Sequence, residues 1–314
     1  MDANLRFWRA EGQSFFQRFL LWTDVLDPLL LLKSSDEIRS SRLSIQSSGK
    51  TPSEPIQSDQ VFWTVSSVHP DTDKIIPVLF RLPGKFPQEN LLASVPKSIF
   101  AYNLSFLQFV FHTYTTGFTL LNGNGTTKSE GYLPHEKQIY YGLGAVSYAA
   151  CIGALPFVFM NRYTVKSTLT QLTVKRVLPA SLLGLMSAFT VAVVRSPEFE
   201  DGIEVMDRNG KVVGVSQKAG EKAIKETTLS RAVLFGTAFC LPAVLMHFVE
   251  RRKLVKTPRA LASLRMILIT SVLAGMLPVS LSMFPQCGEI KRADLEPEIQ
   301  SSTEETELFY NRGV

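Results

Sequence analysis

The residues that could perform acid–base, nucleophilic or metal chemistry are scattered along this chain of 314 residues. Neither the histidines nor the cysteines show a metal-ligand or redox spacing. They are His69, His112, His135 and His247, with Cys151, Cys240 and Cys287. The sequence also contains no phosphate-binding glycine loop and no G-x-S-x-G nucleophile elbow. We therefore expect no enzyme activity, no metal site and no cofactor.

Long stretches without charge decide the fold class. Five of them contain no Asp, Glu, Lys or Arg, namely residues 98–121, 138–161, 177–194, 232–249 and 266–288. A helix of about 20 residues crosses the ~30 Å hydrocarbon core of a membrane. An ionised side chain at its centre costs roughly 2.5–3.5 kcal/mol. The pattern predicts an all-α membrane protein with about five transmembrane helices. His112 lies inside the first stretch, as a proton-relay candidate or as a satisfied histidine.

The remaining segments carry the charge and suggest an orientation. Residues 1–97 form a charged extramembrane region, and the net charge of +5 lacks the basic cluster with aromatics that nucleic-acid binding requires. The connections after the second and fourth spans are basic, whereas residues 289–314 form a tail with three basic and seven acidic side chains. Short loops rich in Lys and Arg remain on the side of the membrane from which the protein is inserted. This rule predicts the N-terminus on the positive side of the membrane, which is the matrix or the cytoplasm, and the C-terminus on the opposite side.

Local patterns suggest further elements outside and between the spans. Residues 4–22 interleave aromatics with arginines, as in an amphipathic helix that rests on a membrane or packs on the bundle. Residues 40–60 are rich in Ser, Pro and Gln and suggest a flexible connector. In the loop of residues 195–231, alternation around Asn209-Gly210 predicts a β-hairpin over 202–214, followed by a helix over 217–231.

Small residues recur at four-residue spacing in the second and third spans. Such stripes let helix backbones approach closely where no hydrophobic effect drives their association. They comprise Ala145, Ala149, Gly153, Ala180, Gly184, Ala188 and Ala192. We expect close packing of these two spans against neighbouring helices.

Several short motifs, in their order and spacing, resemble the sideroflexins, a family of inner mitochondrial membrane proteins with about five spans. They include Asp27-Pro28, His69-Pro70-Asp71-Thr72, Arg195-Ser-Pro-Glu198, Gly202-Ile-Glu-Val-Met-Asp207, Ser230-Arg231 and Phe284-Pro285-Gln286. The resemblance covers nearly the whole chain. The last residues, Thr303–Val314, and the N-terminal tryptophans look most like the divergent sideroflexin-4 branch.

The family resemblance implies transport of small neutral amino acids, serine above all, into mitochondria. Where relatives carry amide side chains in spans one and three, this chain has hydroxyl residues. The candidate substrate-binding residues implied in this way are Thr115, Thr116, Thr119, Ser187 and Thr190. An amide offers a donor and an acceptor together, and an unpaired buried polar group costs about 1–3 kcal/mol. We therefore expect serine transport to be weak or absent.

The branch resemblance implies instead a role in respiratory complex I assembly and in iron and iron–sulfur homeostasis. The expected partners are inner-membrane lipid, complex I assembly proteins or subunits, and a small neutral amino acid if transport is retained. An active carrier of such a metabolite is the alternative. Asp71 and Thr72 would either cap a helix or serve in ligand contact or gating, and the acidic tail would either be solvated or supply contacts to other inner-membrane proteins.

Overall fold

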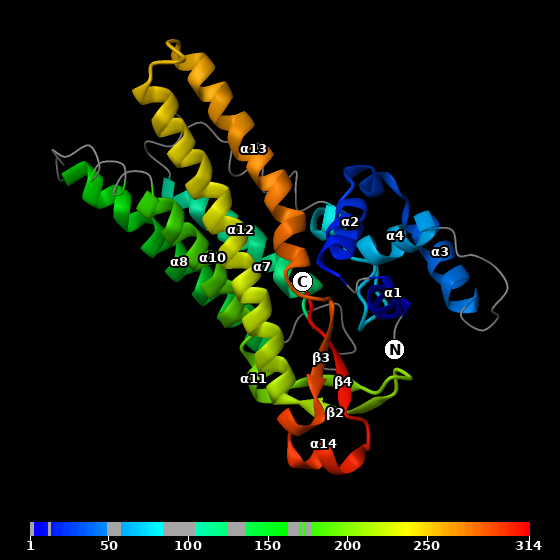
Figure 1. Ribbon diagram of the computed structural model, residues 1–314. Helices are drawn as coiled ribbons and strands as arrows, with labels where there is room; N and C mark the ends of the chain where they lie inside the picture. Colours follow the sequence, from blue (N-terminus) through cyan, green and yellow to red (C-terminus); the bar gives the residue numbers. More distant parts are fainter. Residues whose placement is uncertain are drawn as a thin grey trace.

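The computed structural model describes residues 3–11, 14–48, 58–83, 104–124, 136–162 and 177–314, together with Thr170 and Thr173. Most of the described chain is helical, and Figure 1 shows a bundle of long helices with a group of short N-terminal helices beside it and a small sheet at one end. Residues 98–103 of the first expected span and most of the basic connection after the second span lie outside the described residues.

Each of the five uncharged stretches contributes one helix to the bundle. These helices are α7 (Leu104–Asn122), α8 (Glu136–Arg162), α10 (Leu178–Val194), α12 (Gln217–Arg251) and α13 (Pro258–Ser282). Helix α10 packs against α8 and α12, α7 packs against α8, and α12 packs against α13. The predicted helix over 217–231 is confirmed, since it forms the first turns of α12.

Three of the described helices are long and apolar enough to cross a membrane: residues 137–156 of α8, all of α12 and all of α13. Helix α10 is also apolar but shorter. The fifth span was expected to extend to residue 288, and this boundary is wrong, because α13 ends at Ser282 and Cys287 opens a strand. The prediction of a mostly helical membrane fold is confirmed, while the count of five crossings stays a prediction.

The predicted hairpin is confirmed and belongs to a larger sheet. Strands β1 (Ile203–Met206) and β2 (Val212–Ser216) flank a turn in which Gly210 has a φ of 81°, a backbone conformation that favours glycine. A short helix, α11 (Pro197–Asp201), precedes the hairpin. Strand β1 of the hairpin pairs with β4 (Glu307–Asn311), and β4 pairs with β3 (Cys287–Lys291). The strand order of the sheet is therefore β2-β1-β4-β3.

The acidic C-terminal segment is folded, so the interpretation as a solvated tail is wrong. Besides the two strands it contains the short elements η4 (Arg292–Asp294) and α14 (Pro297–Ser302). Leu295, Ile299 and Leu308 are buried against Ile203 and Val205 of the hairpin. Apolar residues interspersed among the acidic ones supply this second core.

The N-terminal region consists of helices that pack on the bundle. They are α1 (Ala3–Glu11), α2 (Phe15–Val25), η1 (Pro28–Leu32), α3 (Ser35–Ser48), α4 (Ser58–Ser67) and η2 (Val78–Phe80). The expected helix over 4–22 is divided in two, because Ser14 caps α2 through a capping box with Gln17. The flexible connector is wrong for residues 40–48, which are helical, and residues 49–57 lie outside the described chain.

Buried tryptophans favour packing on the bundle over simple rest on a membrane. The rings of Trp8 and Trp22 lie 4.6 Å apart, and both join a core with α7, α12 and α13. Helix α2 packs on α13, and the Arg18 side chain donates to the Ser282 carbonyl oxygen. Phe16 and Leu20 nevertheless remain exposed on the outer face of α2.

The N-terminal region and the C-terminal segment meet at the same end of the bundle. The Arg9 guanidinium lies 3.9 Å from the centre of the Phe309 ring and donates to the Arg208 carbonyl oxygen in the hairpin. The backbone N–H of Val314 donates to the carbonyl oxygen of Asn122, where α7 ends. The Arg9 contacts bring the N-terminal region beside the C-terminal sheet, whereas the charge rule placed these two regions on opposite sides. The charge rule could not detect that the N-terminal region folds back toward the sheet.

Candidate functional site

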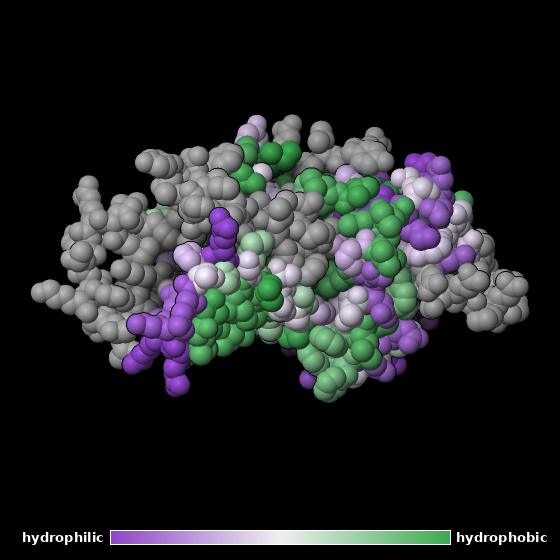
Figure 2. Space-filling view, turned by 90° about the horizontal axis from the view of Figure 1, so that it is seen from above, coloured by the Kyte–Doolittle hydropathy of each residue, from purple (hydrophilic) through white to green (hydrophobic). Residues whose placement is uncertain are grey.

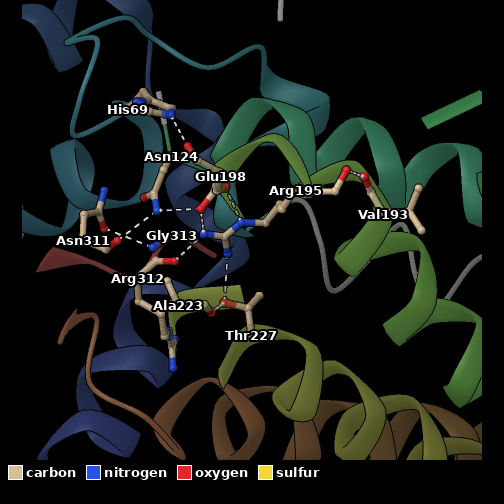
Figure 3. A network of polar contacts seen from close by, with 12 residues as sticks. His69, Asn124, Val193, Arg195, Glu198, Ala223, Thr227, Asn311, Arg312 and Gly313 are labelled. Atoms are coloured by element: carbon tan, nitrogen blue, oxygen red, sulfur yellow. Dashed lines mark hydrogen bonds and ion pairs between the residues drawn. The ribbon is translucent and has the colours of Figure 1, made fainter. Parts of the chain in front are cut away.

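A buried ion pair stands where the bundle meets the sheet. Helix α10 ends at Val194, and the turn that follows brings Arg195 and Glu198, three residues apart, side by side. The guanidinium donates to both carboxylate oxygens, over 2.6 Å and 2.7 Å, and both side chains are at most 2% exposed. Such a bidentate pair is geometrically specific. In Figure 3 this pair occupies the centre of a network of polar contacts.

Arg195 and Glu198 connect elements that are distant in the sequence. The Arg195 guanidinium also donates to the Thr227 hydroxyl of α12 over 3.0 Å and to the Arg312 carbonyl oxygen over 2.8 Å (Figure 3). The Asn124 amide donates to Glu198 and to the Asn311 carbonyl oxygen. The network therefore joins the ends of α7 and α10 to α12 and to the C-terminal segment.

The His69-Pro70-Asp71-Thr72 motif forms a turn that docks on this network. It follows α4, and the backbone N–H groups of Asp71 and Thr72 donate to Nδ1 of His69. The interpretation of Asp71 and Thr72 as helix caps is therefore wrong. Nε2 of His69 (Figure 3) lies 2.7 Å from the Gly123 carbonyl oxygen. The Asn311 amide donates to the Asp71 carboxylate.

The Phe284-Pro285-Gln286 motif forms the link between α13 and β3 and holds Arg312. The Arg312 guanidinium donates to the carbonyl oxygens of Phe284 and Leu281. The backbone N–H of Arg312 donates to the carbonyl oxygen of Gln286. The Gln286 amide donates to the Asn311 side chain. Burial lowers the pKa of Arg312 to about 10, with Glu226 opposing the shift, and the side chain stays charged at neutral pH.

Three of the motifs named from the sequence, His69–Thr72, Arg195–Glu198 and Phe284–Gln286, thus meet in one place. The residues that the motifs did not include are Asn124, Thr227, Asn311 and Arg312. For Asn311 and Arg312 the signal was present, because both lie in the last residues that resemble the sideroflexin-4 branch. This assembly, which we call the junction network, ties segments together that lie far apart in the sequence. Among the described residues, no group of three His, Cys, Asp or Glu side chains could hold a metal ion.

The five expected substrate-binding residues lie together inside the bundle, and the structure shows them closed off from solvent. All five are between 1% and 7% exposed, at the packed faces of α7 and α10. Thr115 and Thr119 donate their hydroxyls to carbonyl oxygens of α7, and Thr190 does so within α10. Helix-internal bonds of this kind leave no donor free for a ligand.

Other polar atoms in the same interior have no partner among the described residues. They are the Thr116 and Ser187 hydroxyls, both ring nitrogens of His112 and Oε1 of Gln108. The methyl group of Thr116 lies near Gly142 of α8, which in turn lies near Val194 of α10, so these groups belong to the α7–α8–α10 interior. Buried polar groups without partners are costly. They mark this interior as the place where a small polar ligand would be recognised if the helices separated.

Comparison with known proteins adds an independent finding. A family model described as Sideroflexins matches residues 4–314. Sideroflexin-4 of Danio rerio is 42% identical, covering 100% of both chains, and that of Homo sapiens is 38% identical over 100% of this chain and 93% of its own. Sideroflexin-5 of Caenorhabditis elegans is 31% identical over 98% of this chain and 94% of its own. No solved structure matches the chain.

Proposed function

This chain belongs to the sideroflexin family of membrane proteins, and from that premise we propose that it serves respiratory complex I assembly and iron–sulfur homeostasis in the mitochondrial inner membrane. On this proposal it keeps the helix arrangement of a small-amino-acid carrier but does not transport serine at the rate of other sideroflexins. Its partners are assembly proteins or subunits of complex I. The full-length likeness to sideroflexin-4 proteins supports this assignment over that of a serine carrier.

The observation that carries the proposal is the closed interior between α7 and α10. Thr115, Thr119 and Thr190 donate to carbonyl oxygens of their own helices, and these side chains are buried. The junction network adds bonds that resist separation of α7, α10 and α12 at one end. Alternating access requires movement of such elements against each other. A bundle held in this way suits a scaffold better than a carrier.

The basic connections suggest an orientation for the scaffold. The turn between α12 and α13 carries Arg251, Arg252, Lys253 and Lys256, all exposed, at the end of the bundle away from the sheet (Figure 1). Because basic loops remain inside, we place this end in the matrix. The sheet, the N-terminal helices and both chain ends then face the intermembrane space.

The test uses cells that lack the protein, with complex I assembly and matrix serine uptake followed over time after it is restored. We expect assembly intermediates to disappear and iron–sulfur enzyme activity to recover while serine uptake stays unchanged. Purified protein in vesicles should take up labelled serine no faster than empty vesicles. Serine uptake at the rate of other sideroflexins would overturn the proposal.

The second candidate is an active carrier of a small neutral amino acid or related metabolite. The unpartnered Ser187 and Thr116 hydroxyls favour it, because a substrate could supply their missing bonds. Ser187→Ala and Thr116→Val remove groups that contribute no hydrogen bond to the fold, so protein level should not fall. On the carrier hypothesis these two substitutions abolish uptake of the metabolite. Thr115→Val serves as the comparison variant, because the hydroxyl that it removes already donates to a carbonyl oxygen of its own helix. Unchanged uptake in both variants would exclude a site at these hydroxyls.

A further inference from the structure

A groove of about 920 Å³ separates the N-terminal helices from α13. One wall comes from the end of α2, η1 and α4, and includes Leu29, Phe62 and Trp63. The other wall comes from α13 and consists of Ala274, Leu277 and Pro278. The volume lies in the range of ordinary ligand sites, about 300–1,000 Å³. The groove is separate from the α7–α10 interior and from the junction network.

The α13 wall places this groove beside the bilayer. Only 11% of the apolar window of α13 is buried inside the protein, so most of its surface faces lipid. Figure 2, viewed from above the α12–α13 tip, shows apolar surface along this helix next to the purple basic tip. Leu29 at the groove is itself 66% exposed. A groove between such a helix and charged helices outside the membrane lies at the level of the lipid headgroups, where a lipid can reach it with both its acyl chains and its headgroup.

Charged groups occur on the wall formed by the N-terminal helices. Asp24 and Asp27 contribute carboxylates, and one Asp27 oxygen accepts from the Leu29 N–H over 2.9 Å. The Lys33 ammonium lies 4.0 Å from the centre of the Trp63 ring and 3.7 Å from a Glu37 oxygen. Two carboxylates and one ammonium give the lining a net negative charge. Such a lining disfavours an anionic headgroup and accepts hydrogen bonds from a protonated amine.

We propose that this groove binds one phosphatidylethanolamine molecule of the bilayer. Its primary ammonium donates to Asp24 and Asp27, its phosphate lies near Lys33, and an acyl chain runs along the exposed Ala274 and Leu29. A trimethylammonium headgroup has no N–H to donate, so phosphatidylcholine binds more weakly. Cardiolipin, which brings two phosphates and no amine, is disfavoured by the carboxylates. The bound lipid links the N-terminal helices to the membrane domain.

The test is native mass spectrometry of the full chain, released from vesicles that contain equal amounts of phosphatidylethanolamine, phosphatidylcholine and cardiolipin. We expect one retained phosphatidylethanolamine per chain. Ala274→Trp places an indole in the groove from an exposed position and should reduce this retention at least tenfold. Gly275→Trp is the matched control, because Gly275 does not line the groove and a Cβ atom there would meet no atom of the described residues within 4 Å.

A second variant addresses headgroup recognition. Asp24→Asn removes a carboxylate from an exposed side chain and should lower the preference for phosphatidylethanolamine over phosphatidylcholine several-fold while lipid is still retained. The proposal is overturned if the wild type keeps no lipid or keeps the three lipids equally. It is also overturned if Ala274→Trp retains as much phosphatidylethanolamine as Gly275→Trp does. None of these outcomes depends on whether the protein serves complex I assembly.

Discussion

At the scale of single residues, the buried Arg195–Glu198 pair is the feature with the largest expected energetic consequence. A buried pair contributes little net stability over apolar residues, but loss of one partner leaves an uncompensated charge. Here the remaining charge would also be surrounded by Arg312, Thr227 and Asn124, which are already engaged with the pair. The motif Arg195-Ser-Pro-Glu198 indicated that these residues matter. Its spacing could not reveal their partners, because these lie far away in the sequence.

Replacement of Glu198 by Gln should destabilise the protein strongly. The change keeps the shape of the side chain and leaves the Arg195 guanidinium unpaired, at a cost of roughly 3–5 kcal/mol. The apparent melting temperature of purified protein should fall on the order of 10 °C. Glu221→Gln makes the same substitution in the exposed pair with Lys225 and should leave the melting temperature unchanged. Equal melting temperatures for the two variants would contradict the role of the junction network.

At the scale of elements, uncharged stretches predicted the bundle helices because lipid excludes ionised groups. The stripe of small residues also indicated where α10 packs closely. A Cβ atom at Gly184 would lie 2.8 Å from the backbone nitrogen of Gly236 in α12, so the two helices touch through their backbones. The pairing of the hairpin with β4, and of β4 with β3, was not predictable. Acidic residues masked the alternation of the C-terminal strands, and the pairing joins segments about 100 residues apart.

Gly184→Ala should weaken the crossing of α10 and α12. The added methyl group forces the two backbones apart, and overpacking of this kind costs about 1–3 kcal/mol. The apparent melting temperature should fall by several degrees. Gly236→Ala lies on the opposite helix of the same crossing, yet its Cβ would meet no atom within 4 Å, so this control should melt as the wild type does. A wild-type melting temperature for Gly184→Ala would show that the helices do not touch there.

The link between α14 and α12 should depend on pH through Glu296. Burial alone would raise the pKa of this carboxyl, but hydrogen bonds from the Lys218 N–H and the Ser216 hydroxyl lower it below its ordinary value of 4.5. The ionised form is therefore favoured on folding. Its contribution to stability is complete above the ordinary pKa and is lost as pH falls through the lower pKa of the folded protein.

Glu296→Gln should remove this part of the pH dependence. The difference in apparent melting temperature between wild type and variant should be largest near neutral pH and shrink as the pH falls below 4.5. Glu304→Gln, which changes another carboxyl of the same segment, provides the comparison. A difference that stays constant over this range would contradict the assignment of the shift to Glu296.

At the scale of the whole molecule, the structure brings the N-terminal helices, the hairpin and the C-terminal segment to one end of the bundle. The sequence predicted the bundle of long helices correctly, whereas it placed the two chain ends on opposite sides. That expectation rested on counting five crossings from the charge pattern. Contacts such as Arg9 with Phe309, His69 with Gly123 and Asn311 with Asp71 involve residues that no local pattern relates.

Single-cysteine labelling of the protein in sealed mitoplasts tests this arrangement most directly. In a background without Cys151, Cys240 and Cys287, one cysteine is placed at Arg39 in α3, at Lys211 in the hairpin or at Lys256 between α12 and α13, all exposed positions. A membrane-impermeant maleimide should label the cysteines at 39 and 211 and reach the one at 256 only after detergent is added. Labelling at 211 with protection at 39 would place the N-terminal helices and the hairpin on opposite sides of the membrane and contradict the structure.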